Sequence, residues 1–452
     1  MSQQQSGQSQ SGQAVSGQLR IGICGLGTVG AGTLRLLEEN RETISCRTGY
    51  EIVVTHVATR TPKPELCNNV ATTGTDPLAV AADPDVDIVV ETIGGYDIAF
   101  DVIKTALDNG KHVVTANKAL IAEKGNELFQ LANDKSVALA FESAVAGGIP
   151  IIKALREGLA ANEIDWLAGI INGTGNFILS EMTANQSQFA DVLQEAQELG
   201  YAEADPTFDV EGIDAAHKLT IMGSIAFGIP LQFNKTYTEG ISRITPDDIS
   251  YANELGYVIK HLGIARQTEY GIEMRVHPTL VAKSRLLANV NGVGNAILVQ
   301  GNFVGSTLYS GPGAGAEATA SAVVADLVDL ARQARAGVAE PVYPALGYRE
   351  PNSEIPVLPI EEIEAEYYLR IPVIDRVGVM AKVSNALQDQ DISIEAVIQK
   401  EASSEQGIPI VILTHRVKEQ KLNQALSALE ALDEVTGAIM RIRVEPFHGV
   451  AS

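Results

Sequence analysis

The chain has 452 residues, of which 45% are hydrophobic and 20% charged, and its formal net charge at pH 7 is −23. The length predicts several domains, and the composition is typical of a globular protein. The negative charge disfavours nucleic acid and anionic membrane surfaces as partners, because both attract clustered Lys and Arg. No run approaches the ~18 consecutive apolar residues of a membrane span.

The N-terminal region carries the cysteines and an unusual leading segment. The three cysteines, Cys24, Cys46 and Cys67, form no CxxC pair, which predicts reduced thiols, a reducing compartment and no structural zinc. Residues 1–18 are rich in Gln, Ser and Gly and lack charge. They have neither the apolar core of a secretion signal nor the arginines of a transit peptide. We expect them to form a disordered tail.

Residues 19–141 alternate between apolar strands and helices. The first strand leads through a glycine-rich turn into a helix whose inner side carries Leu34 and Leu37. The strands are continuous apolar runs, as in a parallel sheet that is covered on both faces. Further strands are expected within residues 51–60, 86–95 and 111–120, with a helix at 97–110 that ends at Gly110. This pattern predicts a Rossmann-type, doubly wound domain.

Three further regions follow in the chain. Residues 142–340 predict a second α/β domain that ends in a glycine-rich turn and a long helix. Residues 341–364 are rich in Pro and Glu and are expected to be a linker. Residues 365–450 show the order βαββαβ, which predicts a ferredoxin-like module.

The glycine-rich turn predicts dinucleotide binding. Gly25, Gly27 and Gly30 form GLGTVG directly after a strand and at the start of a helix. The first glycine permits the tight turn, the second lets the backbone approach a pyrophosphate, and the third lets the helix pack on the strand. The helix N-terminus offers N–H groups and a positive dipole end to the phosphates.

The loop after the second strand predicts which cofactor is used. NAD sites place a carboxylate there to accept the ribose 2′-hydroxyl, but this strand ends THVATRTPK, without an acid. Arg60 offers a guanidinium suited to a 2′-phosphate, so NADP(H) is expected in preference to NAD(H). The alternative is an ordinary solvated loop arginine.

An acidic loop precedes a single lysine in AQELGYAEADPTFDVEGIDAAHK, residues 196–218. Asp214 and Lys218 are separated by four residues, so they project from the same helix face. They form either an exposed salt bridge, worth a few tenths of a kcal/mol, or a pocket with a tuned proton donor that receives an amine-bearing substrate. The helix continues as LTIMGSIAFGI, so its start is expected to pack against the core, which favours the pocket.

The spacing within this loop resembles the signature of the homoserine dehydrogenases. The matching positions are Ala196, Gly200, Tyr201, Asp205, Pro206, Asp209, Gly212, Asp214 and Lys218. Further agreement comes from VTANKAL around Lys118, ESAVAGGIPII from Glu142, NGTGNFIL from Asn172 and GPGAG at 311–315. The resemblance covers residues 19 to 340, and the C-terminal module resembles an ACT domain.

The resemblance implies the reversible NAD(P)-dependent interconversion of L-homoserine and L-aspartate 4-semialdehyde in threonine, methionine and isoleucine biosynthesis. It implies that residues 142–340 serve catalysis and dimerisation, with a last helix that returns to the nucleotide domain. It also implies a cytoplasmic homodimer or homotetramer. Lys218 would give a proton to the carbonyl oxygen in the reducing direction, where hydride transfer builds negative charge, and Lys118 would lie between substrate and nicotinamide. The implied catalytic residues are Lys218, Lys118 and Asp214, and the implied substrate residues are Glu203, Asp209, Asp214 and Lys118. The implied cofactor residues are Gly25, Gly27, Thr28, Val29, Gly30, Arg60, Thr92, Lys118, Gly200 and Gly315.

Two further sites are implied by the same resemblance. A sodium ion would bind Glu142 and the backbone carbonyls of Val145, Gly147 and Ile149, although almost any loop can offer such oxygen ligands. L-Threonine would bind near Gly378 of the ACT module and inhibit the enzyme by feedback. The module could instead serve only as a dimerisation surface.

Two rival functions share features with this sequence. Aspartate-semialdehyde dehydrogenase needs a cysteine nucleophile in its catalytic domain, and no cysteine follows Cys67. A non-catalytic amino-acid-binding regulator, made of an inactive Rossmann domain and an ACT sensor, remains the alternative. The intact Lys118, Lys218 and acidic loop speak against it.

Overall fold

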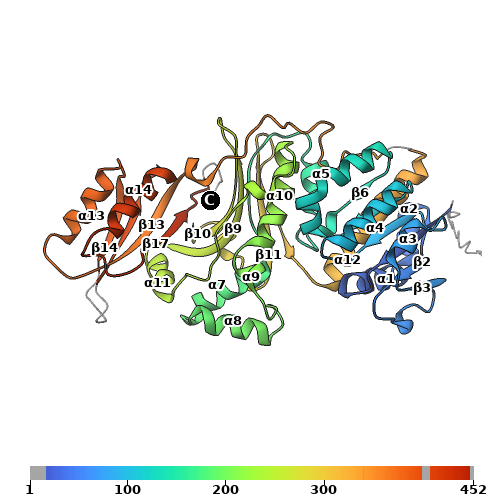
Figure 1. Ribbon diagram of the computed structural model, residues 1–452, viewed down its shortest axis with the longest axis horizontal. Coiled ribbons are helices and arrows are strands. Elements are labelled where there is room, and N and C mark those ends of the chain that lie inside the picture. Colours follow the sequence, from blue (N-terminus) through green and yellow to red (C-terminus); the bar gives the residue numbers. More distant parts are fainter. Residues whose placement is uncertain (1–16, 339–340, 400–407, 448–452) are drawn as a thin grey trace, which may run out of the picture. The chain divides into compact units, whose positions relative to one another are not determined.

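The computed structural model describes residues 17–338, 341–399 and 408–447, which form two compact units (Figure 1). One unit comprises Met1–Gly148 and Gly315–Ala345, and the other comprises Ile149–Ala314 and Leu346–Ser452. The expected disordered tail lies outside the described residues except for its last two, and the second of these, Gln18, already opens the first strand. No helix in the described part of the chain is long and apolar enough to cross a membrane.

The first unit is built on a six-stranded parallel sheet with the strand order β3-β2-β1-β4-β5-β6. The strands are β1 (Gln18–Cys24), β2 (Glu51–Ala58), β3 (Thr72–Gly74), β4 (Ile88–Glu91), β5 (His112–Thr115) and β6 (Leu139–Ala140). The helices are α1 (Thr28–Glu39), α2 (Arg41–Thr48), α3 (Pro77–Ala82), α4 (Asp97–Asp108), α5 (Lys118–Asp134) and α12 (Ala316–Ala336). Single 3-10 turns occupy Pro64–Leu66 and Glu142–Ala144. The predicted Rossmann-type fold is confirmed.

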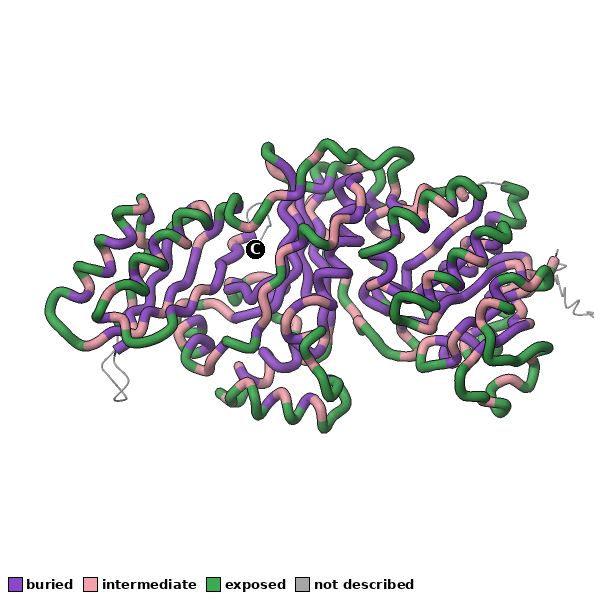
Figure 2. Tube along the Cα trace, viewed as in Figure 1, coloured by how far each residue is buried: buried purple, intermediate pink, exposed green. Residues whose placement is uncertain are grey.

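Burial explains why the strands of this sheet read as continuous apolar runs. Ile23 of β1 and Val90 of β4 are fully buried, since helices cover both faces of the sheet (Figure 2). The predicted inner positions Leu34 and Leu37 of α1 share a core cluster with Leu327 of α12. The last long helix, α12, therefore completes the nucleotide-binding unit. The short β3 and α3 were not predicted.

The second unit contains an 11-stranded sheet whose main path is β12-β11-β7-β9-β10-β17-β13-β15-β14. Its strands are β7 (Ile164–Ile170), β8 (Tyr237–Thr238), β9 (Tyr257–Gln267), β10 (Ile272–Ala282), β11 (Gly294–Gly301), β12 (Gly305–Pro312), β13 (Glu364–Val373), β14 (Ile394–Gln399), β15 (Ile408–Thr414), β16 (Val417–Lys418) and β17 (Met440–Val444). Its helices are α6 (Ile151–Lys153), α7 (Gly173–Asn185), α8 (Phe189–Glu198), α9 (Thr207–Val210), α10 (Ile213–Phe227), α11 (Pro246–Glu254), α13 (Val379–Gln388) and α14 (Glu419–Glu430). A π-helical segment at Ala154–Gly158 and 3-10 turns at Phe233–Lys235, Leu286–Asn289 and Ile360–Glu362 complete it.

The C-terminal module has the predicted βαββαβ order, as β13-α13-β14-β15-α14-β17. Its last strand also pairs in parallel with β10, at Thr279 with Arg443 and at Leu280 with Val444. One sheet thus continues from the preceding α/β region into this module. Their hydrophobic core is shared as well, because Leu280 of β10 belongs to the same buried cluster as Tyr368 of β13.

Part of the expected linker is also bound to this sheet. The backbone N–H of Ile272 donates to the carbonyl of Pro356, and the N–H of Leu358 donates to the carbonyl of Ile272, both at 2.8 Å. The stretch before β13 therefore lies along the end of β10 and is held by backbone hydrogen bonds.

Candidate active site

The glycine-rich turn of the first unit has a geometry that only glycine satisfies at two positions. Gly25 has φ of +101°, and a Cβ there would lie 2.7 Å from the backbone of Thr92. A Cβ on Gly30 would lie 2.0 Å from the carbonyl oxygen of Gly25. The hydroxyl of Thr92 donates to that same oxygen at 2.6 Å. The turn and the end of β4 are thus packed backbone to backbone.

The helix start beyond this turn is open. Gly27 is the N-cap of α1, no side chain among the described residues caps the helix there, and a Cβ on Gly27 would meet nothing within 4 Å. Gly27 and Thr28 are exposed, and Val29 is half-buried. Backbone N–H groups at a helix start without a capping side chain are suited to bind phosphate. These residues therefore fit the pyrophosphate of a dinucleotide.

Two cations follow β2, beside this turn. Arg60 is exposed, directly after the strand. The ammonium of Lys63 donates to the carbonyl oxygen of Leu26 at 2.8 Å, so it contacts the turn itself. The sequence singled out Arg60, but Lys63 is the cation that touches the glycine-rich turn.

Glu91, at the end of β4, was missed as a functional candidate. It is fully buried, and its carboxylate accepts hydrogen bonds from the hydroxyl of Thr115 at 2.5 Å and from the N–H groups of Ile93 and Gly94 at 2.7 and 3.0 Å. Burial raises the pKa of Glu91, and these hydrogen bonds oppose that rise. Glu91 fixes the loop after Thr92 to the end of β5. An acid that ends an apolar strand was the available sequence signal.

Lys118 is the first residue of α5 and is half-buried. Asn117 caps this helix through its side-chain oxygen, which accepts from the N–H of Leu120 at 3.1 Å. Its amide also donates to the carbonyl oxygen of Gly95 at 2.6 Å. The loops after β4 and β5 are therefore tied together, and Lys118 begins at their junction, on the same sheet edge as the glycine-rich turn.

The positions expected to bind sodium are divided between the two units. Glu142 is buried, and Ala146 and Gly147 adopt left-handed φ values of 56° and 47°. Ile149 opens the second unit. Across the described residues, no group of three or more His, Cys, Asp or Glu side chains is arranged to hold a metal ion. The sodium site stays a prediction.

A buried ion pair stands at the start of α10 in the second unit. The ammonium of Lys218 donates to Oδ2 of Asp214 and to the carbonyl oxygen of Ile171, both at 2.7 Å. Lys218 is 8% exposed and Asp214 is 5% exposed. The predicted packing of this helix start is confirmed. The interpretation of Asp214 and Lys218 as an exposed salt bridge is wrong. The rest of α10 is apolar and buried, so the start of the helix and this ion pair are buried with it.

Asn172, at the end of β7, joins this pair to a second acid. Its amide donates to Oδ2 of Asp214 at 2.9 Å and to Oδ1 of Asp209 at 2.8 Å. Its own oxygen caps α7 by accepting from the N–H of Gly175 at 2.7 Å. Burial raises the pKa of Asp209, while the hydrogen bond from Asn172 lowers it. Lys218, Asp214, Asn172 and Asp209 are hereafter the lysine cluster.

The remaining predicted residues are not members of this cluster. Glu203 is exposed, and among the described side chains no hydrogen bond joins its carboxylate to the lysine cluster. Gly200 follows α8 with φ of 78°, in the second unit. Gly315 precedes α12 with φ of 114°, in the first unit. Gly378 is the exposed N-cap of α13 with φ of 91°.

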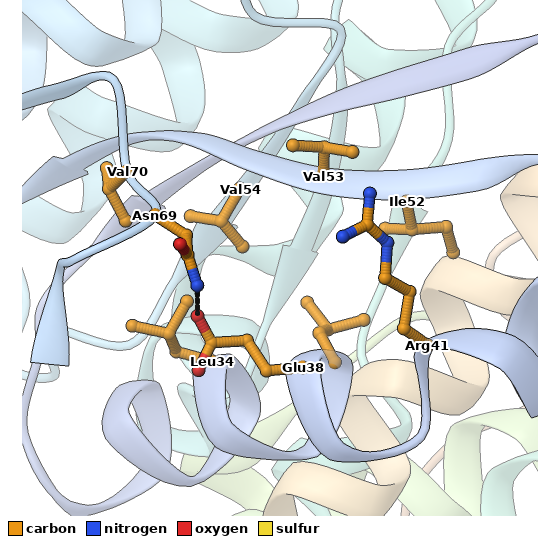
Figure 3. Close-up of a pocket in the computed structure, with 9 residues that line it drawn as sticks. Leu34, Glu38, Arg41, Ile52, Val53, Val54, Asn69 and Val70 are labelled. Carbon is orange, nitrogen blue, oxygen red and sulfur yellow. Dashed lines mark hydrogen bonds between the residues drawn. The ribbon is translucent and has the colours of Figure 1, made fainter.

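A surface pocket in the first unit lies on a different part of the fold (Figure 3). It is lined by Leu34, Leu37, Glu38, Arg41, Ile52, Val53, Val54, Asn69 and Val70. The amide of Asn69 donates to the carboxylate of Glu38 at 3.2 Å, from the loop to the second half of α1. None of the predicted cofactor residues lines it.

Comparison with known proteins decides what these parts belong to. The sequence matches the model of the homoserine dehydrogenase NAD binding domain over residues 25–142, that of homoserine dehydrogenase over residues 150–328, and that of the ACT domain over residues 367–434. The homoserine dehydrogenase of Pseudomonas aeruginosa is 60% identical over 416 residues, covering 91% of this chain and 95% of that protein. The chain belongs to the homoserine dehydrogenase family.

Solved structures of the family agree with this assignment. The homoserine dehydrogenase of Thiobacillus denitrificans is 55% identical, with a TM-score of 0.90 over 95% of this chain and 98% of that one. The enzyme of Staphylococcus aureus is 33% identical, with a TM-score of 0.74 over 95% of this chain and 99% of that one. The chain is therefore an oxidoreductase with an ACT domain. The alternative of a non-catalytic regulator is wrong.

Proposed function

We propose that this enzyme interconverts L-homoserine and L-aspartate 4-semialdehyde with Lys218 as the proton donor in the reducing direction and the proton acceptor in the oxidising direction. The observation that carries the proposal is the buried pair of Lys218 and Asp214, tied to Asp209 through Asn172. Both charged groups are buried, where they act more strongly on a bound substrate than they would in water.

The nicotinamide cofactor supplies the hydride when it is bound. The protein's own part is to hold the substrate oxygen beside Lys218, whose ammonium stabilises the developing negative charge and transfers a proton to it. Asp214, Asp209 and Glu203 attract the substrate's α-ammonium group. Lys118 is assigned to the space between the substrate and the nicotinamide, as the resemblance implies.

We further propose NADP(H) as the preferred cofactor. No acid lies between the end of β2 and Lys63 to accept a ribose 2′-hydroxyl, whereas Arg60 and Lys63 both carry positive charge there. A hyperthermophilic archaeal homoserine dehydrogenase mutant was solved in complex with NADPH; it is 27% identical, with a TM-score of 0.60 over 69% of this chain and 97% of that one. Gly25, Gly27, Thr28, Val29, Gly30 and Thr92 of the first unit, with Gly200 and Gly315, are assigned to the same cofactor.

The remaining assignments rest on the resemblance. They are sodium at Glu142, Val145, Gly147 and Ile149, feedback by L-threonine near Gly378, a homodimer or homotetramer, a cytoplasmic location, and a place in threonine, methionine and isoleucine biosynthesis. The proposed domain limits are residues 19–141, 142–340 and 365–450. Three thiols without a disulfide among the described residues support a reducing compartment.

Replacing the lysine tests the proposed chemistry. Lys218→Met keeps the apolar stem and removes the ammonium, so kcat for homoserine oxidation should fall by about 10²- to 10⁴-fold, the range for a lost proton-transfer group. NADP+ affinity should stay at the wild-type value. The matched control is Lys283→Met, since Lys283 also donates to a backbone carbonyl but is exposed. Wild-type turnover by a folded Lys218→Met enzyme would exclude the proposed role.

A further inference from the structure

A four-residue segment after β8 contacts both the ACT module and the acidic loop. This bridging segment, Glu239–Ser242, runs from the end of β8 toward α11. The N–H of Glu239 donates to the carbonyl of Val276 on β10 at 2.8 Å, which anchors the segment to the sheet. Its two ends make different sets of contacts, and all of them lie within the second unit.

The carboxylate of Glu239 is held by the last strand of the ACT module. Oε2 accepts from Nη1 of Arg443 at 2.7 Å and from Nη2 of Arg441 at 3.2 Å, both on β17. Arg443 is almost fully buried and also pairs with Glu419 of α14. Burial alone would raise the pKa of Glu239, but the attraction of Arg443 holds it below its usual value. Glu239 is therefore an anion bound by the ACT module.

The other end of the bridging segment is fastened to the acidic loop. The N–H of Ile241 donates to the carbonyl of Val210 at 2.9 Å, and the hydroxyl of Ser242 donates to Oε1 of Glu211 at 2.8 Å. A Cβ on Gly240 would lie 2.2 Å from Oε2 of Glu211, so the bridging segment and the acidic loop are in close contact here. Glu211 lies two residues after Asp209, a member of the lysine cluster.

A buried histidine extends the contact to the start of α10. Nε2 of His261 lies 3.0 Å from the carbonyl oxygen of Glu239, and because a carbonyl only accepts, this nitrogen carries the proton. Burial lowers the pKa of His261 to about 4, so the ring is neutral at physiological pH. The ring also packs against Gly212, where a Cβ would meet it at 3.2 Å. Gly212 is the N-cap of the helix that carries Asp214 and Lys218.

We propose that Glu239 is a positioning residue for the reaction. Arg443 and Arg441 of the ACT module bind the carboxylate of Glu239 and so fix the bridging segment. The bridging segment and His261 in turn set the position of the acidic loop and of the start of α10. This inference rests on the proposed function of the lysine cluster. A movement of β17, by whatever cause, then shifts the residues that hold the substrate. It supplies a contiguous route from the ACT module to the site of chemistry.

The test uses full-length enzyme and a matched pair of variants. Glu239→Gln removes the charge that Arg443 and Arg441 hold and keeps the side-chain shape. It should raise the KM for homoserine by about tenfold, within the range seen for residues that couple sites without touching ligand, and leave the KM for NADP+ unchanged. Asp248→Asn is the control. Asp248 of α11 accepts two hydrogen bonds from Arg370 of β13, so this substitution also weakens a bond between a carboxylate and an arginine of the ACT module. Among the described contacts, Asp248 makes none with the acidic loop. Asp248→Asn should lower the Tm and leave the homoserine KM unchanged.

A second variant covers the case in which Glu239→Gln does not fold. Ser242→Ala breaks the far end of the bridging segment at an exposed residue. It should raise the homoserine KM about threefold, and in combination with Glu239→Gln the effect should be smaller than the product, because both break one route. Equal homoserine KM in wild type, Glu239→Gln and Ser242→Ala would overturn the proposal, as would an equal rise in Asp248→Asn. A wild-type enzyme that does not turn over homoserine would instead refute the proposed function.

Discussion

The glycine-rich turn and the lysine cluster are assembled in opposite ways. The turn takes its shape from glycines within one short stretch, where Gly30 avoids overlap with the backbone of Gly25 and Gly25 avoids overlap with the backbone of Thr92. The lysine cluster joins Asn172 to Asp209, which follows it by 37 residues, and to Asp214 and Lys218 on α10, and charge and hydrogen bonds hold it together. Steric fit therefore determines the shape of the glycine-rich turn, whereas electrostatic interactions between buried groups hold the lysine cluster together. Substitutions should affect the two sites differently.

The largest effect is expected at the turn, where Gly30→Ala and Gly27→Ala should separate stability from binding. A Cβ at Gly30 overlaps the backbone of Gly25, so Gly30→Ala should reduce the free energy of unfolding by about 1–3 kcal/mol, the cost of overpacking. A Cβ at Gly27 meets no protein atom within 4 Å, so Gly27→Ala should keep the wild-type Tm. The added methyl group should occupy space that the pyrophosphate needs, so the KM for NADP+ should rise about tenfold.

Calorimetry on the cofactor-free enzyme and NADP+ saturation kinetics check this contrast. If both variants lose stability equally, steric fit does not distinguish the two glycines. If Gly27→Ala keeps its NADP+ affinity, the pyrophosphate does not approach this position.

An effect of comparable size is expected in the lysine cluster. Asn172→Ala removes hydrogen bonds to two carboxylates, each worth about 1.5–3 kcal/mol because the acceptor is charged. It should lower kcat/KM for homoserine by about 10²-fold. The lost cap of α7 should cost only about 1 kcal/mol of stability. Steady-state kinetics with Asn302→Ala, an exposed asparagine, as the control would check it. Full activity in Asn172→Ala would mean that the two acids need no alignment.

The smallest effect is expected at Arg60, which is exposed and therefore screened by solvent. Arg60→Ala should raise the KM for NADP+ by about tenfold, the loss of one charge-assisted hydrogen bond. The KM for NAD+ should not change, since NAD+ has no 2′-phosphate. Kinetics with both cofactors measure the ratio directly. A proportional loss with both would remove Arg60 from 2′-phosphate recognition.

The sequence predicted the local features well. Apolar runs predicted β1, β2, β4 and β5, because strands buried on both faces must be apolar throughout. The spacing of Asp214 and Lys218 predicted a shared helix face, and the apolar sequence after them predicted its burial. These inferences depend only on neighbouring residues.

Features that depend on distant residues were missed. Asn172 was noticed only as part of a motif, because its two acidic partners follow 37 and 42 residues later. Glu91 pairs with Thr115 on the neighbouring strand, a partner that a linear pattern does not reveal. The parallel pairing of β17 with β10 was not predicted, since a split-βαβ pattern is complete without an outside strand.

That shared strand ladder limits how the ACT module can be studied and engineered. Cutting the chain before β13 would remove β17 from the edge of β10 and leave the buried Arg275 with Glu273 as a partner but without Glu445, the second carboxylate that it pairs with. Such a truncate would confound a loss of the proposed feedback with aggregation and misfolding. Point substitution around Gly378 is therefore a better test of the proposed effector site than deletion of the module.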